Sequence, residues 1–498
     1  MRPSAKSSFP EPLPAVARRW RVLLGIVAIL SAAAAVELSF WHRSQRPLVG
    51  HLSLHGWLAL STAIGISVAS FLLALRTPGW MMHGIERLAR PAAFERSGAK
   101  ALLLLLLALL PLAAACYQAV PAGSALSPDE AHFLRLAAGI RDSGGPVALI
   151  RDLYAGRWSE SNRHPLYPAL LALAGATPAA AIALSTAAIG LSLLALYKLL
   201  RLWQFNASSA AAGTVLASAS AALVRSAVST LADAALCAGV LGCWCTVAAS
   251  SRAGSSRRRL LYAAAAGLAA GTAYLTKATA LLWCGPLLLV TFWPNRVERC
   301  VALSTALAVA LLISSPLWVC NLRRFGNPIY NYNQRFLFAD SFDANHPAEP
   351  SLRAAAAKFL DRHGWQGVAR RACSGILWEA VIICRGTAPP GPEPLRLVIG
   401  TAVVALATTA VVLRAATAAD AALLSTLTLA YAAFGWYVPI AASERLVLPA
   451  IALLTGLGSA ALATLCPTDR SRRALAIVVA VGTCAVVLLA PPGFWPKL

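Results

Sequence analysis

Two neighbouring carboxylates, Asp129 and Glu130, are the residues of this sequence whose type and position point most directly to chemistry. They follow a long apolar stretch, residues 101–120, in a chain of 498 residues with only 20 acidic side chains. A carboxylate placed next to a reacting hydroxyl group can accept its proton as a general base. The pair therefore marks the first candidate for a reaction site.

Other polar side chains stand at the ends of apolar stretches. Asp233 and Lys277 occupy two such ends, and Glu444 with Arg445 occupies a third. An ionisable group within a membrane span is costly and usually functional. Further polar residues in comparable places are Asn162, His164, Tyr167, Asn321 and Arg323.

Each of these residues also has a simpler interpretation. The acidic pair can be a solvated loop, His164 before Pro165 can cap a helix, and Lys277 can extend to the lipid headgroups. Taken together, however, they place carboxylates and cations on one face of a membrane. Cations there suit a lipid-linked phosphate whose negative charge grows as it leaves, and a carboxylate nearby suits the attacking hydroxyl. The combination predicts group transfer from a polyprenyl-phosphate carrier.

The elements that must position these residues are membrane helices. Hydrophobic residues make up 58% of the chain and charged residues 13%, against about 25% charged residues in soluble domains. Spans in lipid have to satisfy their backbone groups internally, so they are helical. We predict an all-α polytopic membrane protein of about thirteen spans: 22–41, 55–75, 100–120, 179–200, 207–225, 228–250, 259–275, 278–294, 300–319, 396–413, 420–440, 446–465 and 473–490.

The net charge of +23 follows membrane topology and does not indicate nucleic acid. Basic clusters fall at alternate span ends, and the positive-inside rule places these ends in the cytoplasm: residues 18–21, 76–100, 198–201, 252–259, 296–299, 414 and 470–473. Two long segments, 121–178 and 321–395, then lie outside and carry amphipathic helices. Membrane lipids are expected partners.

The predicted organisation has four parts. A disordered cytoplasmic N-terminus, 1–21, precedes an accessory transmembrane hairpin and cytoplasmic loop, 22–99. The membrane core, 100–465, contains both outer segments, and 466–498 form the last span and the C-terminus. The cysteines show no metal spacing, so we predict no metal and no cofactor. Whether Cys373 and Cys384 form a disulfide stays open.

At these residues the chain resembles the C-type glycosyltransferase superfamily, specifically the bacterial protein-O-mannosyltransferase-like and aminoarabinose-transferase-like enzymes. The motifs that carry the resemblance are Asp129-Glu130-Ala131, His164-Pro165-Leu166-Tyr167-Pro168, Asp233, residues 267–277 ending in Leu-Thr-Lys, Asn321 with Phe325-Gly326-Asn327-Pro328, and Glu444-Arg445-Leu446 before Pro449. They cover roughly residues 100 to 465. The hairpin 22–75 and the absence of a soluble C-terminal domain depart from the usual pattern.

The resemblance implies a C-type glycosyltransferase fold in the bacterial inner membrane, with the site on its periplasmic face. A sugar would move from a polyprenyl-phosphate donor to an extracytoplasmic acceptor (a protein, a lipid or a glycan) with inversion. Asp129 would be the catalytic base, Glu130 would orient a substrate, and Asp233 would be a second acidic site residue. Lys277 and Arg445 would hold the lipid phosphate, with Arg323 as a further candidate. The acceptor or structural residues would be Asn162, His164, Tyr167, Asn321 and Glu444.

Two other functions compete with this one. A transporter of lipids or solutes shares many spans and buried charges, but it would be expected to show internal repeats, and none is visible. An O-antigen-ligase-like or polymerase-like enzyme would instead use the late outer segment, with His346, Arg362, His363 and Arg370. That hypothesis leaves Asp129, Glu130 and Asp233 unexplained, so we rank it lower.

Overall fold

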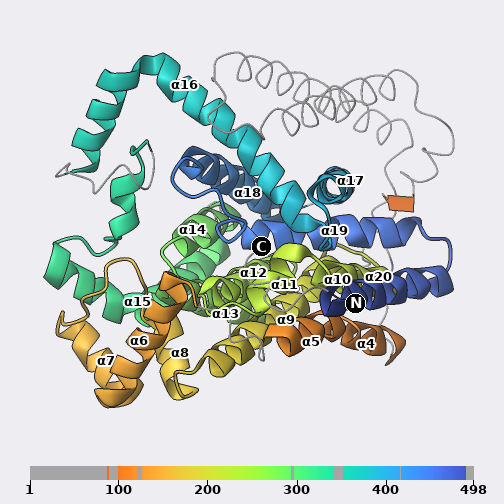
Figure 1. Ribbon diagram of the computed structural model, residues 1–498, viewed down its shortest axis with the longest axis horizontal. Helices are drawn as coiled ribbons and strands as arrows, with labels where there is room; N and C mark the ends of the chain where they lie inside the picture. The colour runs from red at the N-terminus through yellow and green to blue at the C-terminus, as the bar shows by residue number, and fades with distance from the viewer. Residues whose placement is uncertain are drawn as a thin grey trace.

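The structure is a computed structural model that describes residues 87–88, 99–119, 126–292, 297–340, 351–415 and 417–489. Regular structure in these ranges is helical throughout, and they contain no strand. The expected disordered N-terminus and the predicted spans 22–41 and 55–75 lie outside the described residues. Figure 1 shows the described helices as one bundle with shorter helices gathered at one end.

Seven of the described helices are long and apolar enough to cross a membrane. They are α9 (Pro178–Leu202), α12 (Asp233–Ser251), α15 (Val297–Phe325), α17 (Glu393–Arg414), α18 (Ala418–Tyr437), α19 (Leu448–Leu465) and α20 (Asp469–Leu489). An eighth span results if α10 (Ala207–Ser218) and α11 (Ala221–Ala227), which are bent by 67° at their junction, count as one. The protein is therefore an integral multi-pass membrane protein.

A count of thirteen spans is not confirmed, because several predicted spans are shorter or interrupted. The stretch 100–120 forms two helices, α4 (Ala99–Leu106) and α5 (Leu109–Ala119). The stretch 278–294 forms α14 (Ala280–Thr291), whose 12 residues rise about 18 Å, against a hydrocarbon core of about 30 Å. The predicted span 259–275 lies within α13 (Ser256–Thr276), whose first turn carries three arginines. This helix is not among the seven candidate spans.

Small residues let the central helices approach closely. Helix α12 packs against α9 and α13, and α13 packs against α15. A Cβ atom at Gly213 of α10 would lie 2.7 Å from the Cβ atom of Ala460 of α19, and Gly239 of α12 faces Ala273 of α13 in the same way. In lipid, where burial of apolar surface gives little drive for association, such close packing stabilises helix pairs.

The first predicted outer segment forms three short helices at one end of the bundle: α6 (Pro128–Asp142), α7 (Gly145–Tyr154) and α8 (Leu166–Leu173). Helix α6 begins with strong local signals. Ser127 caps its N-terminus, Pro128 occupies the first turn, and Asp129 and Glu130 follow there. The sequence around the acidic pair thus fixes where this helix starts.

The second predicted outer segment contains a 3₁₀ turn, η1 (Tyr332–Phe336), and a long helix, α16 (Leu352–Thr387). Helix α16 lies within the segment 321–395, where amphipathic helices were predicted, and it changes direction at Gly364, whose φ of 61° is in the left-handed region. Beyond this kink, α16 packs on α17 and α18 (Figure 1).

Cys373 and Cys384 are both on α16 and both are free thiols. Eleven helical positions separate them, which corresponds to about 16 Å along the axis. A disulfide requires Cα atoms within about 7 Å. The two cysteines therefore do not form a disulfide with each other in this fold.

Candidate functional site

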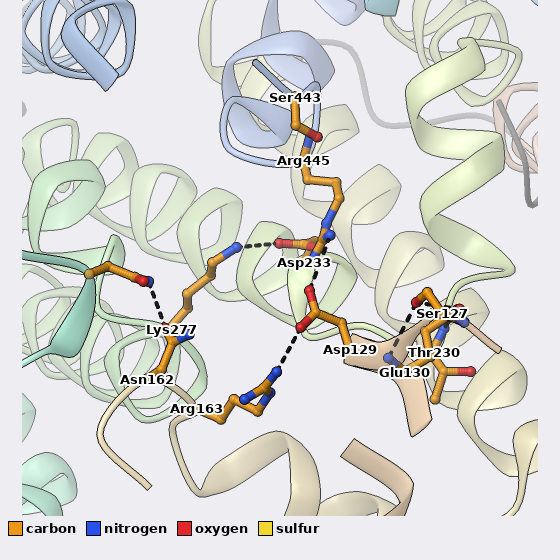
Figure 2. Close-up of polar contacts among 11 residues, drawn as sticks. Ser127, Asp129, Glu130, Asn162, Arg163, Thr230, Asp233, Lys277, Ser443 and Arg445 are labelled. Atoms are coloured by element: carbon orange, nitrogen blue, oxygen red, sulfur yellow. Dashed lines mark hydrogen bonds and ion pairs between the residues drawn. The ribbon is translucent and has the colours of Figure 1, made fainter. Parts of the chain in front are cut away.

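The candidate residues meet at one end of the bundle because several helices begin or end there. Asp233 is the first residue of α12, and Lys277 is the C-cap residue of α13. Arg445 lies in the connection between α18 and α19, and Asp129 lies in the first turn of α6. Figure 2 shows these four side chains pointing toward one another. Residues separated by more than 300 positions in sequence thus form one site.

Asp233 is the centre of the site. Its side chain is only 2% exposed, and each of its carboxylate oxygens accepts from a different cation. Lys277 Nζ lies 2.6 Å from Oδ1, and Arg445 Nε lies 2.8 Å from Oδ2. A buried carboxylate is tolerated only when it is paired in this way. Asp233 therefore fixes the positions of both cations that the sequence assigned to a lipid phosphate.

Arg445 also links Asp233 to the acidic pair. Its Nη1 atom lies 3.7 Å from Asp129 Oδ2, while its Nε atom is bonded to Asp233. Asp233 is the main cause of a raised pKa of Arg445, and Asp129 contributes to it. Arg445 is 40% exposed and Asp129 is 50% exposed. Both side chains can therefore meet a substrate, whereas Asp233 is enclosed.

Asp129 and Glu130 point in different directions (Figure 2). Glu130 Oε2 accepts from the backbone nitrogen and the hydroxyl group of Ser127, which completes a capping box on α6. Its Oε1 atom accepts from the backbone nitrogen of Thr230, at 3.0 Å, just ahead of α12. Glu130 thus ties the start of α6 to the start of α12 and holds Asp129 near Asp233. Its predicted catalytic role stays a prediction.

Arg163 is a site residue for which no role was predicted from the sequence. Its Nη2 atom donates to Asp129 Oδ1 at 2.6 Å, and its guanidinium group lies over the ring of Phe133, 5.7 Å from the centroid. Its position between Asn162 and His164, which were both predicted as site residues, could have identified it. With Arg445 on the other oxygen, Asp129 lies between two arginines (Figure 2).

His164 anchors the segment that carries this arginine. The ring is 4% exposed, and its Nδ1 atom is hydrogen-bonded to the backbone oxygen of Tyr274, three residues before Lys277. Burial is the main cause of a pKa lowered to about 4. The imidazole is therefore neutral at pH 7 and connects the start of α8 with the end of α13.

The other residues predicted from the sequence have supporting positions. The Asn162 amide oxygen accepts from Asn333 at 2.6 Å, and Tyr167 is buried with its hydroxyl group 3.4 Å from that of Ser185. Asn321 is buried and donates to the backbone oxygens of Pro328 and Tyr330, which shapes the turn after α15.

Arg323 is exposed and lies beside Gly156, in the connection between α7 and α8. Within the described part of the chain, Arg323 forms no hydrogen bond or ion pair with Asp129, Asp233 or Lys277. The structure therefore does not bring Arg323 into this site.

Glu444 belongs to a neighbouring cluster. It is 4% exposed, and Arg385 Nε and Arg396 Nη2 lie 2.9 Å and 3.1 Å from its Oε1 atom. Arg225 Nη1 lies 3.5 Å from its Oε2 atom. The sequence selected Glu444 but none of these three arginines, since Arg225 is far from the other two in the chain and no local pattern joins them to Glu444.

The geometry places two cations beside an enclosed and a half-exposed carboxylate. Lys277 and Arg445 both pair with the enclosed Asp233, and Arg445 also contacts half-exposed Asp129. Among the described residues, no group of three or more His, Cys, Asp or Glu side chains is placed to hold a metal ion. The predicted absence of a metal stays a prediction.

No protein-family model and no curated protein sequence matches the chain. Among solved structures, it is similar to ArnT from Cupriavidus metallidurans, in the apo state (17% identity, TM-score 0.38) and bound to undecaprenyl phosphate (16%, 0.37), with 74% of this chain and 79% of that chain covered in both cases. It is also similar to archaeal oligosaccharyltransferase AglB from Archaeoglobus fulgidus, in complex with an inhibitory peptide and a dolichol-phosphate (12%, TM-score 0.46; 78% of this chain, 55% of that chain). Because all three TM-scores are below 0.5, the similarity by itself assigns no role to any residue of this chain.

Proposed function

We propose that the protein is a membrane glycosyltransferase that moves a sugar from a polyprenyl-phosphate donor to a hydroxyl group of an acceptor, on the extracytoplasmic face of the membrane. The observation that supports this most directly is the continuous series of Asp129, Arg445, Asp233 and Lys277, joined by contacts of 3.7, 2.8 and 2.6 Å. In this series half-exposed Asp129 contacts Arg445, and Asp233 joins Arg445 to Lys277 at an end of the bundle. The arrangement suggests a separate role for each of the four residues.

Asp129 is the general base. It takes the proton of the acceptor hydroxyl as that oxygen attacks the anomeric carbon. The new bond joins the acceptor oxygen to this carbon, and the bond from the carbon to the phosphate oxygen breaks with its electron pair. Attack from the face opposite the phosphate inverts the anomeric centre.

Lys277 and Arg445 stabilise the phosphate as it leaves, because its negative charge grows in the transition state. Asp233 touches neither substrate. It holds the two cations 2.6 Å and 2.8 Å from its own oxygens, so they are already in place before the donor binds. Arg163 and Arg445 together orient the Asp129 carboxylate.

The ligase-like alternative relies on residues that the structure engages elsewhere. Arg362 and His363, on the first part of α16, both pair with Asp340, at 2.8 Å and 2.9 Å. His346 lies outside the described residues. These pairs make up a separate group, while Asp129 and Asp233 share Arg445.

The function is tested by deleting the gene for this chain and identifying, by mass spectrometry, the lipid-linked sugar that accumulates. Wild-type protein should remove the accumulated lipid. Asp129→Asn should reduce the rate of transfer by about 10²- to 10⁴-fold, the usual contribution of a general base, with membrane insertion unchanged. Asp142→Asn is the matched control, because Asp142 is an exposed carboxylate on the same helix.

Two results would contradict the proposal. If no lipid-linked sugar accumulates in the deletion strain, the protein is not a transferase of this class. If Asp129→Asn transfers sugar as fast as the Asp142→Asn control, Asp129 is not the base.

A further inference from the structure

We propose that Arg225, Arg385 and Arg396, gathered around Glu444, form a second phosphate-binding site that holds a phosphate group of a lipid beside the transfer site. The ligand chemistry is a phosphate monoester, diester or the outer half of a diphosphate. This inference deepens the proposed function and rests on it for the nature of the lipid substrates.

The three arginines converge from separate elements. Arg225 is near the end of α11, Arg385 is near the end of α16, and Arg396 is in the first turn of α17. They reach Glu444 in the connection before α19, at 3.5, 2.9 and 3.1 Å. Arg396 also donates to the backbone oxygen of Arg385 through Nε and Nη2, so it is fixed in place.

The charges of this cluster do not balance. Three guanidinium groups face one buried carboxylate, and the only further carboxylate paired with them in the described part of the chain is Glu393, 3.7 Å from Arg385 Nη1 and 45% exposed. Even with Glu393 counted, three positive charges meet two negative charges. A contact that served only to join helices would cost least with equal charges, because surplus cations out of water repel one another. A bound anion would balance them.

Donors also remain available to such an anion. Arg225 Nε is buried and, among the described residues, has no hydrogen-bond partner. The side chains of Arg225 and Arg385 are 23% and 31% exposed, so a ligand can reach them, while Arg396 is 7% exposed and lies deepest in the cluster. Arginine is suited to phosphate because its planar fork donates two parallel hydrogen bonds.

The cluster is next to the transfer site. Glu444 and Arg445 are consecutive, and they face different partners: Arg445 pairs with Asp233, while Glu444 pairs with the arginines. Arg225 is five positions before Thr230, whose backbone is held by Glu130. A lipid whose head group reaches Asp129 therefore brings its phosphate close to the second site as well. Its source is either the second phosphate of a diphosphate-linked donor or the phosphate of another lipid, such as the acceptor.

The test measures thermal unfolding of the purified full-length protein in detergent with added inorganic pyrophosphate, undecaprenyl phosphate, undecaprenyl diphosphate or phosphatidylglycerol, at matched ionic strength. At saturation, a specific ligand should raise the unfolding temperature of the wild-type protein by about 2 °C or more. The double variant Arg225→Gln/Arg385→Gln should weaken this effect by about tenfold or more in ligand concentration. Arg353→Gln, which removes an exposed charge from the same helix as Arg385, should respond as wild type.

The responses to the different lipids distinguish the two possible sources of the bound phosphate. A larger shift with undecaprenyl diphosphate than with undecaprenyl phosphate, lost in the double variant, supports the diphosphate. An arginine-dependent shift with phosphatidylglycerol supports the phosphate of another lipid. The proposal is overturned if none of these compounds stabilises the wild-type protein beyond sodium chloride, or if the double variant responds as wild type.

Sugar transfer by Asp129→Asn, measured alongside the shift in unfolding temperature, distinguishes a failure of this inference from a failure of the proposed function. If Asp129→Asn still transfers sugar but the arginine-dependent shift is present, the second site stands and the assigned base fails. If Asp129→Asn is inactive and no shift is seen, the transfer site stands and the second site fails.

Discussion

Two carboxylates at the same end of the bundle, Asp233 and Glu444, are almost equally buried but have different surroundings. Asp233 is held by one lysine and one arginine that are 24% and 40% exposed. Glu444 is held by three arginines, the most exposed of which is 31% exposed. The first group continues through Arg445 to Asp129, which is 50% exposed, and the second continues through Arg385 to Glu393, which is 45% exposed.

Similar ion pairs can therefore serve different purposes. Around Asp233, the cations are partly exposed, and the carboxylate that we propose as the base, Asp129, is next to Arg445. Around Glu444, the arginines join α11, α16 and α17 to the connection before α19, and they carry a surplus of positive charge. That surplus can hold an anion, and Glu393, the one further carboxylate that contacts these arginines among the described residues, pairs with Arg385.

Removing the central carboxylate of each group should change stability most. Glu444→Gln should lower the free energy of unfolding by about 3–5 kcal/mol, because three poorly solvated guanidinium groups then lack a partner. Asp233→Asn should lower it by less, since Lys277 and Arg445 can turn to solvent. Thermal and denaturant unfolding in detergent measures both.

A second substitution checks the cause of that loss. Adding Arg385→Gln to Glu444→Gln should restore part of the lost stability by removing one repelling charge. Equal losses in Glu444→Gln and Asp233→Asn, or no restoration by Arg385→Gln, would show that the two groups do not differ as described.

A dependence on pH should come next in size, and on the Asp233 side it comes from His164. Burial lowers the pKa of His164 from 6.5 to about 4, so the unfolded chain binds a proton more readily than the folded one. Stability from this residue is complete above pH 6.5 and falls as the pH decreases from 6.5 to 4, by about 2 kcal/mol at pH 5.

Unfolding measured from pH 8 to pH 4.5 tests this sign. In His164→Asn the fall should be smaller by the same amount, while His363→Asn, which changes a more exposed imidazole, serves as the control. If wild type and His164→Asn have parallel pH profiles, His164 does not titrate as expected.

The smallest of these effects is expected for Lys277, which we place at the phosphate of the lipid donor. Lys277→Gln should lower kcat/KM for the lipid donor by about tenfold, equivalent to about 1.4 kcal/mol of transition-state stabilisation, and should leave the acceptor KM unchanged. Lys198→Gln, an exposed lysine on α9, is the matched control. Steady-state kinetics with each substrate varied in turn measures this. An unchanged kcat/KM for the lipid donor would remove Lys277 from the phosphate site.

Local patterns in the sequence predicted much of the fold. Apolar stretches predicted the long helices, and the Ser127, Pro128 and Glu130 signals mark the start of α6. The number of spans was not predictable, because length and hydropathy do not reveal where a helix stops. The break between α4 and α5 and the bend between α10 and α11 depend on packing against neighbours.

The sequence selected Asp129, Asp233, Lys277 and Arg445 one by one, since polar residues at the ends of apolar helices are costly and rare. It did not determine that Lys277 and Arg445 pair with the same carboxylate, or that Arg163 pairs with Asp129. It also did not reveal that Glu130 caps a helix while its neighbour faces the site. Contacts between residues 44 and 212 positions apart exist only once the helices have packed, so the site emerges from that packing and not from any local pattern.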